Sequence, residues 1–422
     1  MSVYSELKSR GFISNITDPE IEKYLNENKV TVYCGFDPTA ESLHIGNLVP
    51  LMGLAHFQRY GHKVLPLIGG ATGMIGDPSG KSEERNLQSI AQIKNNAESI
   101  KAQMEKIIRF KGENSAFMVN NYDWTHTMSI LDWLRDVGKH FTLSYMLAKD
   151  SVKSRLSSES GISFTEFSYM TLQAFDFCYL FKNFDCIMQF GGNDQWGNIT
   201  AGIEFIRRVE GKKAFGMTFP LITTSTGDKF GKSAGNAVWL DPEKTTPYRY
   251  YQYWINVTDE DVEKMLKLFT FLDVAEIEEV CKEHKSAPHL RKAQTLLAKE
   301  ATKILHGEEG LKNAETASAA LFGGDLKGLS EADLKGIFND VPSTTISKSE
   351  IEEGVNITNL LVNTGMQSSK GKARTLILQG GCHINNEKVE DPEFTVNLLS
   401  LMHGAMVVIR CGKKNYHLVT IK

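Results

Sequence analysis

Residues 31–60 constrain the fold more than any other part of the chain. The segment begins with an apolar, β-prone run at 31–34, breaks at Gly35 and enters a helical pattern near Ile45. A second apolar run follows at Lys63–Ile68. A strand, a helix and a second strand in this order predict a right-handed βαβ unit with parallel strands, and therefore an α/β fold.

The start of the predicted helix offers a binding site for an anion. The sequence HIGN, residues 44–47, stands where the polar loop after the first strand enters the helix. The first N–H groups of a helix have no partner within it, and the helix dipole favours negative charge there. A ligand that carries phosphate is therefore expected near His44 and Gly46.

The common nucleotide-binding motifs do not occur in the sequence. The glycine-rich stretch GGATGMIGDPSGKS, residues 69–82, resembles a P-loop, but the P-loop spacing requires glycine where Ile75 stands. No G-x-G-x-x-G follows a predicted strand either. A phosphate-bearing ligand would thus be bound in another way.

The pattern of the whole chain predicts three domains. A Rossmann-like parallel-sheet catalytic domain covers 1–222, a loop and connection cover 223–246, an α-helical domain covers 247–322, a linker covers 323–354, and a small α+β domain covers 355–422. In the first domain helices are predicted at Val3–Arg10, 18–28, 83–110, 130–136 and 143–158, and strands at 116–120, 186–190 and 215–221. In the last domain helices are predicted at 359–363 and 368–379, and short strands near His383, near Val389 and at 406–410.

A strongly apolar helix is predicted at 165–182, and three of its polar residues share one face. Tyr169, Gln173 and Asp176 are spaced four and then three residues apart, which aligns them at about 100° per residue. Each would cost about 1–3 kcal/mol if it were buried without a partner. Two interpretations remain open: a hydrogen-bond network with neighbouring helices, or a small ligand with a charged amine and a hydroxyl.

Two polar loops follow predicted strands. The sequence GGNDQWGN, residues 191–198, lies at the carboxyl edge of the sheet, where open α/β sheets bind ligands. The sequence TTSTGDKFGKSAGN, residues 223–236, carries Lys229 and Lys232, which are suited to contact a polyphosphate. A solvated hairpin loop is the alternative for the second sequence.

Charge is distributed unevenly along the chain. The net charge of 422 residues is -4, whereas residues 355–422 contain eight Lys or Arg and four Asp or Glu. The helix predicted at 368–379 carries Lys370, Lys372 and Arg374. A compact basic module fits binding to an RNA backbone, and a solvated charged surface is the alternative.

The cysteines and the hydropathy pattern indicate a cytoplasmic protein without a bound metal. The six cysteines lack the close pairs that zinc sites and redox motifs use, so they are expected to be free thiols in a reducing compartment. No window approaches the roughly 18–20 apolar residues that a membrane span requires.

Taken in chain order, these motifs resemble those of the bacterial tyrosyl-tRNA synthetases, which are class I aminoacyl-tRNA synthetases. HIGN stands where the family has HIGH, and KFGKS, residues 229–233, stands where class I enzymes have KMSKS. The stretches YCGFDPTA, YMTLQAFD and GGNDQWGN also match. The resemblance covers essentially the whole chain and implies that the last domain is an S4-like RNA-binding domain.

The resemblance also implies a role for individual residues. Tyr33 and Asp176 would bind the phenol oxygen of tyrosine. The residues implied to bind tyrosine are Tyr33, Asp37, Asp77, Tyr169, Gln173, Asp176 and Gln195. Those implied to bind ATP are Gly35, His44, Gly192, Asp194 and Lys232, and those implied to act in catalysis are His44, Asn47, Thr39, Lys229, Lys232 and Ser233.

The implied reaction joins L-tyrosine and ATP, with Mg²⁺ carried by ATP, into tyrosyl-adenylate and pyrophosphate. Tyrosine is then transferred to the 3′ end of tRNA(Tyr). The resemblance further implies a homodimer, with the apolar stretch at 131–147 as a candidate interface. A tryptophanyl-tRNA synthetase and a catalytically inactive RNA-binding relative are the alternatives, and Asn47 departs from the histidine of HIGH.

Overall fold

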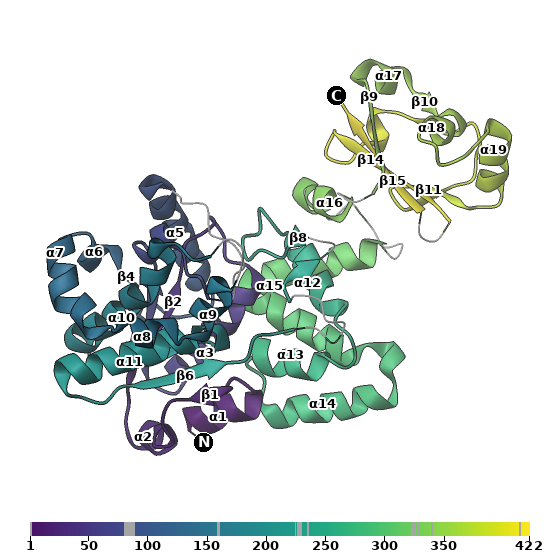
Figure 1. The fold of residues 1–422 in the computed structure, drawn as a ribbon. Helices are drawn as coiled ribbons and strands as arrows, with labels where there is room; N and C mark the ends of the chain where they lie inside the picture. Colours follow the sequence, from purple (N-terminus) through teal and green to yellow (C-terminus); the bar gives the residue numbers. More distant parts are fainter. Residues whose placement is uncertain are drawn as a thin grey trace. The chain divides into compact units, whose positions relative to one another are not determined.

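A computed structural model describes residues 2–79, 89–157, 161–223, 225, 230–233, 236–321, 326, 329–338, 341–412 and 415–422 (Figure 1). The chain forms two compact units, one of Met1–Asp241 with Val257–Leu305 and one of Pro242–Asn256 with His306–Lys422. The boundary near residue 305 falls inside α15 (Lys292–Leu321), where Gly307, with φ 71° and ψ -175°, interrupts the helical geometry. The region that was predicted as one helical domain is thus divided between the two units.

The first unit is built on a six-stranded sheet with the order β1-β6-β5-β2-β3-β4. Its strands are β1 (Asn15–Ile16), β2 (Thr31–Phe36), β3 (Lys63–Ile68), β4 (Val119–Asn120), β5 (Cys186–Gly192) and β6 (Phe215–Phe219). Only β1, at one edge, runs antiparallel to its neighbour. The predicted α/β fold with a parallel sheet is therefore confirmed.

The predicted βαβ unit at the start of the sheet is also confirmed, with one correction. β2 and β3 pair in parallel, and α3 (Ile45–Arg59) connects them. The predicted break at Gly35 is wrong, because the register continues through Gly35, opposite Leu67, to Phe36. Pairing with β3 satisfies the backbone on both sides of the glycine, which outweighs its low strand propensity.

Further helices surround the sheet, and some differ in extent from the prediction. They are α1 (Val3–Arg10), α2 (Ile21–Glu27), α4 (Thr72–Ile75), α5 (Ile90–Met104), α6 (Tyr122–Thr125), α7 (Ile130–Asp132), α8 (Leu143–Leu147), α9 (Asp150–Leu156), α10 (Phe164–Phe184), α11 (Trp196–Glu210), α13 (Val262–Phe269) and α14 (Val274–Ser286). Residues 143–158 form two helices rather than one, and residues 83–88 of the helix predicted at 83–110 lie outside the described residues. α2 starts three residues late because the Asp18 carboxylate accepts the Glu20 N–H in a turn.

Helices cover both faces of the sheet. Phe190 on β5 packs against Phe57 of α3, with ring centroids 5.7 Å apart. The next residue, Gly191, faces α11, since a Cβ atom there would lie 3.3 Å from Ile199. Successive strand residues point to opposite faces, so α3 lies on one face and α11, together with α10, on the other.

The second unit contains a five-stranded sheet with the order β12-β11-β14-β15-β9. Its strands are β9 (Ser343–Ile346), β11 (Cys382–Ile384), β12 (Glu387–Val389), β14 (Met406–Cys411) and β15 (Asn415–Ile421), and β10 (Val355–Asn356) pairs separately with β13 (Thr395–Val396). The helices are α12 (Pro247–Ile255), α16 (Glu331–Phe338), α17 (Lys348–Glu353), α18 (Ile357–Asn363) and α19 (Lys370–Leu378).

The prediction that residues 323–354 form a linker is wrong for much of this segment. β9 pairs in parallel with β15 and completes the sheet. Val407 and Ile409 of β14 face one apolar core, while Val408 faces a second core that includes Phe338 of α16. The sheet is thus buried on both faces, and α16 covers one of these faces. The glycines of the segment 323–354 made this helix difficult to predict from the sequence.

The described helices include none that is both long and apolar enough to cross a lipid bilayer.

Candidate active site

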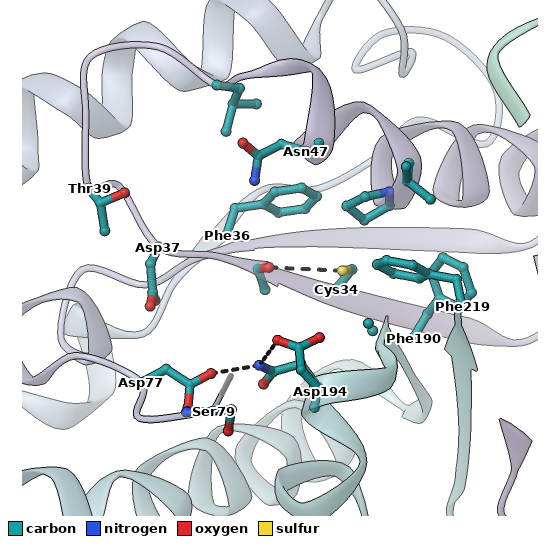
Figure 2. A pocket seen from close by; sticks show the side chains of 18 of the residues that line it. Cys34, Phe36, Asp37, Thr39, Asn47, Asp77, Ser79, Phe190, Asp194 and Phe219 are labelled. Carbon is teal, nitrogen blue, oxygen red and sulfur yellow. Dashed lines mark hydrogen bonds between the residues drawn. The ribbon is translucent and has the colours of Figure 1, made fainter. Parts of the chain in front are cut away.

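A pocket of about 590 Å³ opens at the carboxyl ends of β2 and β5 (Figure 2). This volume lies in the range of small-molecule sites, and the edge of the sheet is the one where α/β folds bind ligands. Lys229 lies outside the described residues, as do the side chains of Lys232 and Ser233. The other residues predicted for the tyrosine, ATP and catalytic sites all line the pocket: Tyr33, Gly35, Asp37, Thr39, His44, Asn47, Asp77, Tyr169, Gln173, Asp176, Gly192, Asp194 and Gln195.

Asp176 lies at the deep end of the pocket and is 2% exposed. Its two carboxylate oxygens accept hydrogen bonds from Asn121 Nδ2 at 2.9 Å and from Trp124 Nε1 at 2.8 Å. Burial raises the pKa of Asp176 to about 7, although these two donors act to lower it. Asp176 is therefore held in place and retains lone pairs for a ligand donor.

Tyr33 lies beside Asp176, and its hydroxyl has no hydrogen-bond partner among the described residues. Its side chain is 1% exposed, and its pKa is raised by burial and then by the charge of Asp176. The side-chain oxygen of Gln189, directly opposite Tyr33 on β5, also lacks a partner among the described residues. Buried polar atoms are rarely left unpaired, so these two groups indicate a polar ligand.

A hydrogen-bond chain crosses the other wall of the pocket. Gln195 Nε2 donates to Asp77 Oδ2 at 2.6 Å and to Asp194 Oδ2 at 3.1 Å (Figure 2). Asn198 Nδ2 lies 3.1 Å from both Gln173 Oε1 and Gln195 Oε1. Burial raises the pKa of Asp77. This wall gathers carboxylates and amide oxygens, which suits a ligand that carries an ammonium group.

The polar face of α10 lines the pocket and also bonds to neighbouring parts of the protein. The structure places Tyr169, Gln173 and Asp176 on the pocket wall, as their spacing predicted. Gln173 and Asp176 nevertheless also bond to neighbouring elements. The internal network of the first interpretation is thus present, and it orients groups that still face the cavity. The ligand of the second interpretation stays a prediction.

The HIGN sequence forms a capping box at the start of α3. His44 Nδ1 accepts the Gly46 N–H at 3.0 Å, and Asn47 Oδ1 accepts the His44 N–H at 3.1 Å. When the ring is neutral, this bond leaves the proton on His44 Nε2. The Asn47 side chain uses its oxygen for the cap and keeps its NH₂ group as a donor beside the pocket (Figure 2).

The HIGN sequence, here the first signature loop, is joined through its backbone to the chain that follows residues 223–236, the second signature loop. His44 and Trp239 form an isolated antiparallel β-bridge, and Ile45 N donates to Val238 O at 2.9 Å. Gly231 has φ 90°, and a Cβ atom there would lie 2.8 Å from Ile45 Cγ2. Only glycine permits both this conformation and this approach. β7 (Lys232–Ser233), which pairs with β8 (Asn236–Ala237), therefore starts next to the first turn of α3.

Sequence reasoning missed Asn121, Trp124, Asn198 and Gln189 as residues of the site. Asn121 and Trp124 come from the short β4–α6 region, and no sequence motif connects them with Asp176, 55 and 52 residues away. Asn198 is the last residue of GGNDQWGN, so its motif gave a usable signal. A glutamine inside an apolar strand was the available signal for Gln189.

The basic residues predicted to bind RNA are all on α19. Lys370, Lys372 and Arg374 are all exposed, and Arg374 pairs with Glu393. Residues two apart on a helix point in nearly opposite directions, so Lys372 lies away from Lys370 and Arg374. The charge of Arg374 is offset by its acidic partner, and the role of the three residues in RNA binding stays a prediction.

Comparison with known proteins matches both the larger N-terminal part and the C-terminal part of the chain to aminoacyl-tRNA synthetases. Residues 25–323 match the family described as tRNA synthetases class I (W and Y), and residues 333–419 match the tyrosine–tRNA ligase SYY-like C-terminal domain. The chain is 50% identical over 422 residues to the tyrosine–tRNA ligase of Roseiflexus castenholzii. The matched region covers 100% of this chain and 99% of the relative. The corresponding protein of Listeria monocytogenes is 50% identical over 425 residues, with 100% of each chain covered.

The chain belongs to the tyrosine–tRNA ligase family. The resemblance inferred from the motifs is thus confirmed.

Solved structures of synthetases share the fold of about three quarters of this chain. A C-terminally truncated mitochondrial tyrosyl-tRNA synthetase of Aspergillus nidulans has a TM-score of 0.70 and 33% identity, and covers 76% of this chain and 94% of its own. Tryptophanyl-tRNA synthetase of Plasmodium falciparum has a TM-score of 0.53 at 14% identity, covering 79% of this chain and 87% of its own. The second likeness shows a shared fold alone.

Proposed function

We propose that this protein activates L-tyrosine with ATP and transfers it to tRNA(Tyr). The main support for this proposal is the deep end of the pocket. There the Tyr33 hydroxyl, which has no hydrogen-bond partner among the described residues, lies beside the Asp176 carboxylate, which Asn121 and Trp124 hold in place. A phenol group donates to Asp176 and accepts from Tyr33. Phenylalanine offers neither bond. It would leave the buried Tyr33 hydroxyl without a partner, at a cost of about 1–3 kcal/mol, and Asp176 with only its bonds to Asn121 and Trp124.

The opposite wall supplies contacts for the amino-acid head group. Asp77, Tyr169 and Gln173 hold the ammonium of tyrosine, and Asp37 and Gln195 flank its carboxylate. The Asp37 carboxylate is already positioned by Thr72, whose hydroxyl donates to it at 3.1 Å. Tyrosine is therefore bound at both ends, which points its carboxylate toward the start of α3.

The chemistry needs alignment and positive charge rather than a covalent enzyme intermediate. A carboxylate oxygen of tyrosine attacks the α-phosphorus of ATP, and the bond from that phosphorus to the pyrophosphate oxygen breaks. His44, Asn47 and Thr39 donate to the phosphates from one side, and Lys229, Lys232 and Ser233 from the other. Gly35, Gly192 and Asp194 line the adenosine, and at Gly192 a Cβ atom would lie 2.3 Å from Asp194 Oδ1.

Mg²⁺ enters with ATP in this proposal. Across the described part of the chain, no group of three or more His, Cys, Asp or Glu side chains is arranged to hold a metal ion. The ion then neutralises phosphate charge while the protein binds the phosphates themselves.

ATP–pyrophosphate exchange measured with each of the twenty amino acids tests this function. We expect exchange with tyrosine and at most trace exchange with phenylalanine and tryptophan. Exchange driven best by tryptophan would replace the proposal with the tryptophanyl alternative. RNA binding without any exchange would indicate the inactive relative.

We also propose that the protein is a cytoplasmic homodimer. Large apolar side chains in and near α7 and α8 are exposed, which is unusual for a monomer: Ile130, Leu131, Leu134, Leu143 and Leu147. A second copy of the chain would cover this surface through a symmetric interface. Sedimentation equilibrium of the wild type and of Leu131→Asp tests it, since a monomeric wild type contradicts the proposal.

The second unit is proposed to bind tRNA through Lys370, Lys372 and Arg374 of α19. Deletion of residues 355–422 is a poor test, because it would leave β9 without β15. The double substitution Lys370→Glu with Lys372→Glu is preferable, with the exposed Lys348→Glu on α17 as control. We expect aminoacylation to fall while pyrophosphate exchange stays at the wild-type rate. Unchanged aminoacylation would contradict the proposal.

A further inference from the structure

We propose that helix α13 positions the second signature loop for adenylate formation, with Asp261 and Phe269 as the positioning residues. This inference rests on the proposed function of the pocket. It adds two residues at the ends of α13, which is labelled in Figure 1 and carries none of the motifs named above. None of the residues of α13 lines the pocket.

The N-terminal end of α13 binds the start of the loop. Asp261 Oδ2 accepts from Ser225 N at 2.9 Å and from Ser225 Oγ at 2.9 Å. The same oxygen accepts from Thr258 Oγ1 at 3.0 Å. Asp261 is the N-cap residue of α13 but makes no capping hydrogen bond with its side chain, so its carboxylate is directed to the loop.

The C-terminal end of α13 holds the loop where its lysine signature begins. Phe230 stacks on Phe269 with ring centroids 5.3 Å apart and an interplanar angle of 12°. Both rings are buried. The stacked pair removes apolar area from water and fixes the direction of the chain just before Gly231, which packs on Ile45 of α3.

α13 is itself fixed to the core of the first unit. The guanidinium of Arg10 on α1 donates to the carbonyls of Lys267 and Thr270 at 3.1 Å each and to that of Leu272 at 2.5 Å. These carbonyls lie at the end of α13, where they have no helical partner. Glu6 pairs with Arg10 at 2.6 Å, and this ion pair is largely buried.

The contacts define how the loop is placed. Ser225 and Phe230 are both attached to one rigid helix, and only the four residues 226–229 separate them. α13 also packs against α3, which carries His44 and Asn47 at its start. The helix thus fixes the loop at Ser225 and at Phe230, and so reduces the conformational entropy that is lost when phosphates are bound.

Single-turnover formation of tyrosyl-adenylate by the full-length chain tests the inference. Ser225→Ala and Asp261→Ala are compared with Asp273→Ala, which removes an N-cap aspartate of α14 that also makes no capping hydrogen bond. We expect the first two variants to lose about 3- to 10-fold in the rate of activation, with the tyrosine dissociation constant within twofold of wild type. Asp273→Ala should match the wild type.

Three further measurements separate positioning from general stability. Asp261→Asn keeps an oxygen acceptor and should restore most of the rate. The double variant Ser225→Ala with Asp261→Ala should lose no more than Asp261→Ala alone, because loss of the carboxylate already removes both bonds to Ser225. Trypsin cleavage in the segment 226–232, located by mass spectrometry, should be faster in Ser225→Ala and in Phe269→Leu than in the wild type.

The outcomes distinguish this inference from the proposed function. A wild type without tyrosine-dependent exchange overturns the function. A wild type that exchanges normally while Ser225→Ala and Asp261→Ala activate at its rate overturns only the positioning role. A loss of rate that is matched by an equal loss of tyrosine affinity overturns it as well, because the defect would then not be specific to the loop.

Discussion

The two ends of the pocket are built in different ways. The deep end depends on Asp176, Asn121 and Trp124, which come from distant parts of the chain and are buried and hydrogen-bonded to one another. The end at α3 depends on residues 44–47, which are adjacent in sequence and form a capping box at a helix terminus. The deep end is rigid and suited to selection of the substrate, whereas the α3 end presents donors to groups whose charge changes during reaction.

Removal of the central group at the deep end should have the largest effect. Asp176→Ala deletes the acceptor of the phenol and leaves the donors of Asn121 and Trp124 unpaired. We expect tyrosine affinity to fall about 100-fold, as expected for the loss of a hydrogen bond to a charged group together with these penalties. Equilibrium dialysis with labelled tyrosine measures it. A change below threefold would show that the deep end does not select the phenol.

Changes at the α3 end should lower the rate more than the affinity. His44→Ala removes the Nε2 donor and half of the capping box, and we expect about a 30-fold lower rate of adenylate formation. Asn47→Ala removes only a neutral donor and the reciprocal cap, and should cost about fivefold. Single-turnover rates compare the two. The reverse order would show that Asn47, not His44, is the main donor.

A milder change at the deep end sharpens the comparison. Trp124→Phe keeps the aromatic volume that stacks on Tyr179 but removes one of the two donors to Asp176. We expect tyrosine affinity to fall about fivefold, with little change in the rate at which bound tyrosine is converted to the adenylate. Pyrophosphate exchange at varied tyrosine concentration separates the two quantities. A lower maximal rate at unchanged KM would argue against a role in binding.

The smallest effect concerns stability as a function of pH. Burial raises the pKa of Asp176 from 3.8 to about 7, so the folded state binds a proton more tightly than the unfolded state. The stability from this group is complete below about pH 4 and is lost as pH rises through about 7. The melting temperature of ligand-free Asp176→Asn, taken relative to the wild type, should therefore be higher at pH 8 than at pH 5 by a few degrees. Calorimetry at both pH values checks this, and a pH-independent difference would contradict the raised pKa.

Local signals in the sequence determined much of the fold and part of the site. The pattern of apolar residues predicted β2, α3, β3 and α10, because each strand is a buried apolar run and each helix is largely apolar. Asn385 and Asn386 form the turn between β11 and β12 with φ values of 51° and 65°, which asparagine adopts more readily than most residues. The face of Tyr169, Gln173 and Asp176 was readable for the same reason, since helical spacing fixes which side chains lie together.

Contacts between distant segments were decided by the tertiary structure alone. Two examples are the hydrogen bonds from Asn121 and Trp124 to Asp176 and the attachment of the second signature loop to α13. Both depend on how elements pack, and neither leaves a periodic signal in the sequence. Cysteines that look scattered in the sequence likewise include Cys382 and Cys411, which face each other across β11 and β14 as free thiols. Sequence patterns report what each segment buries, but only the packed structure determines which buried group meets which, because that choice depends on the shapes of both partners.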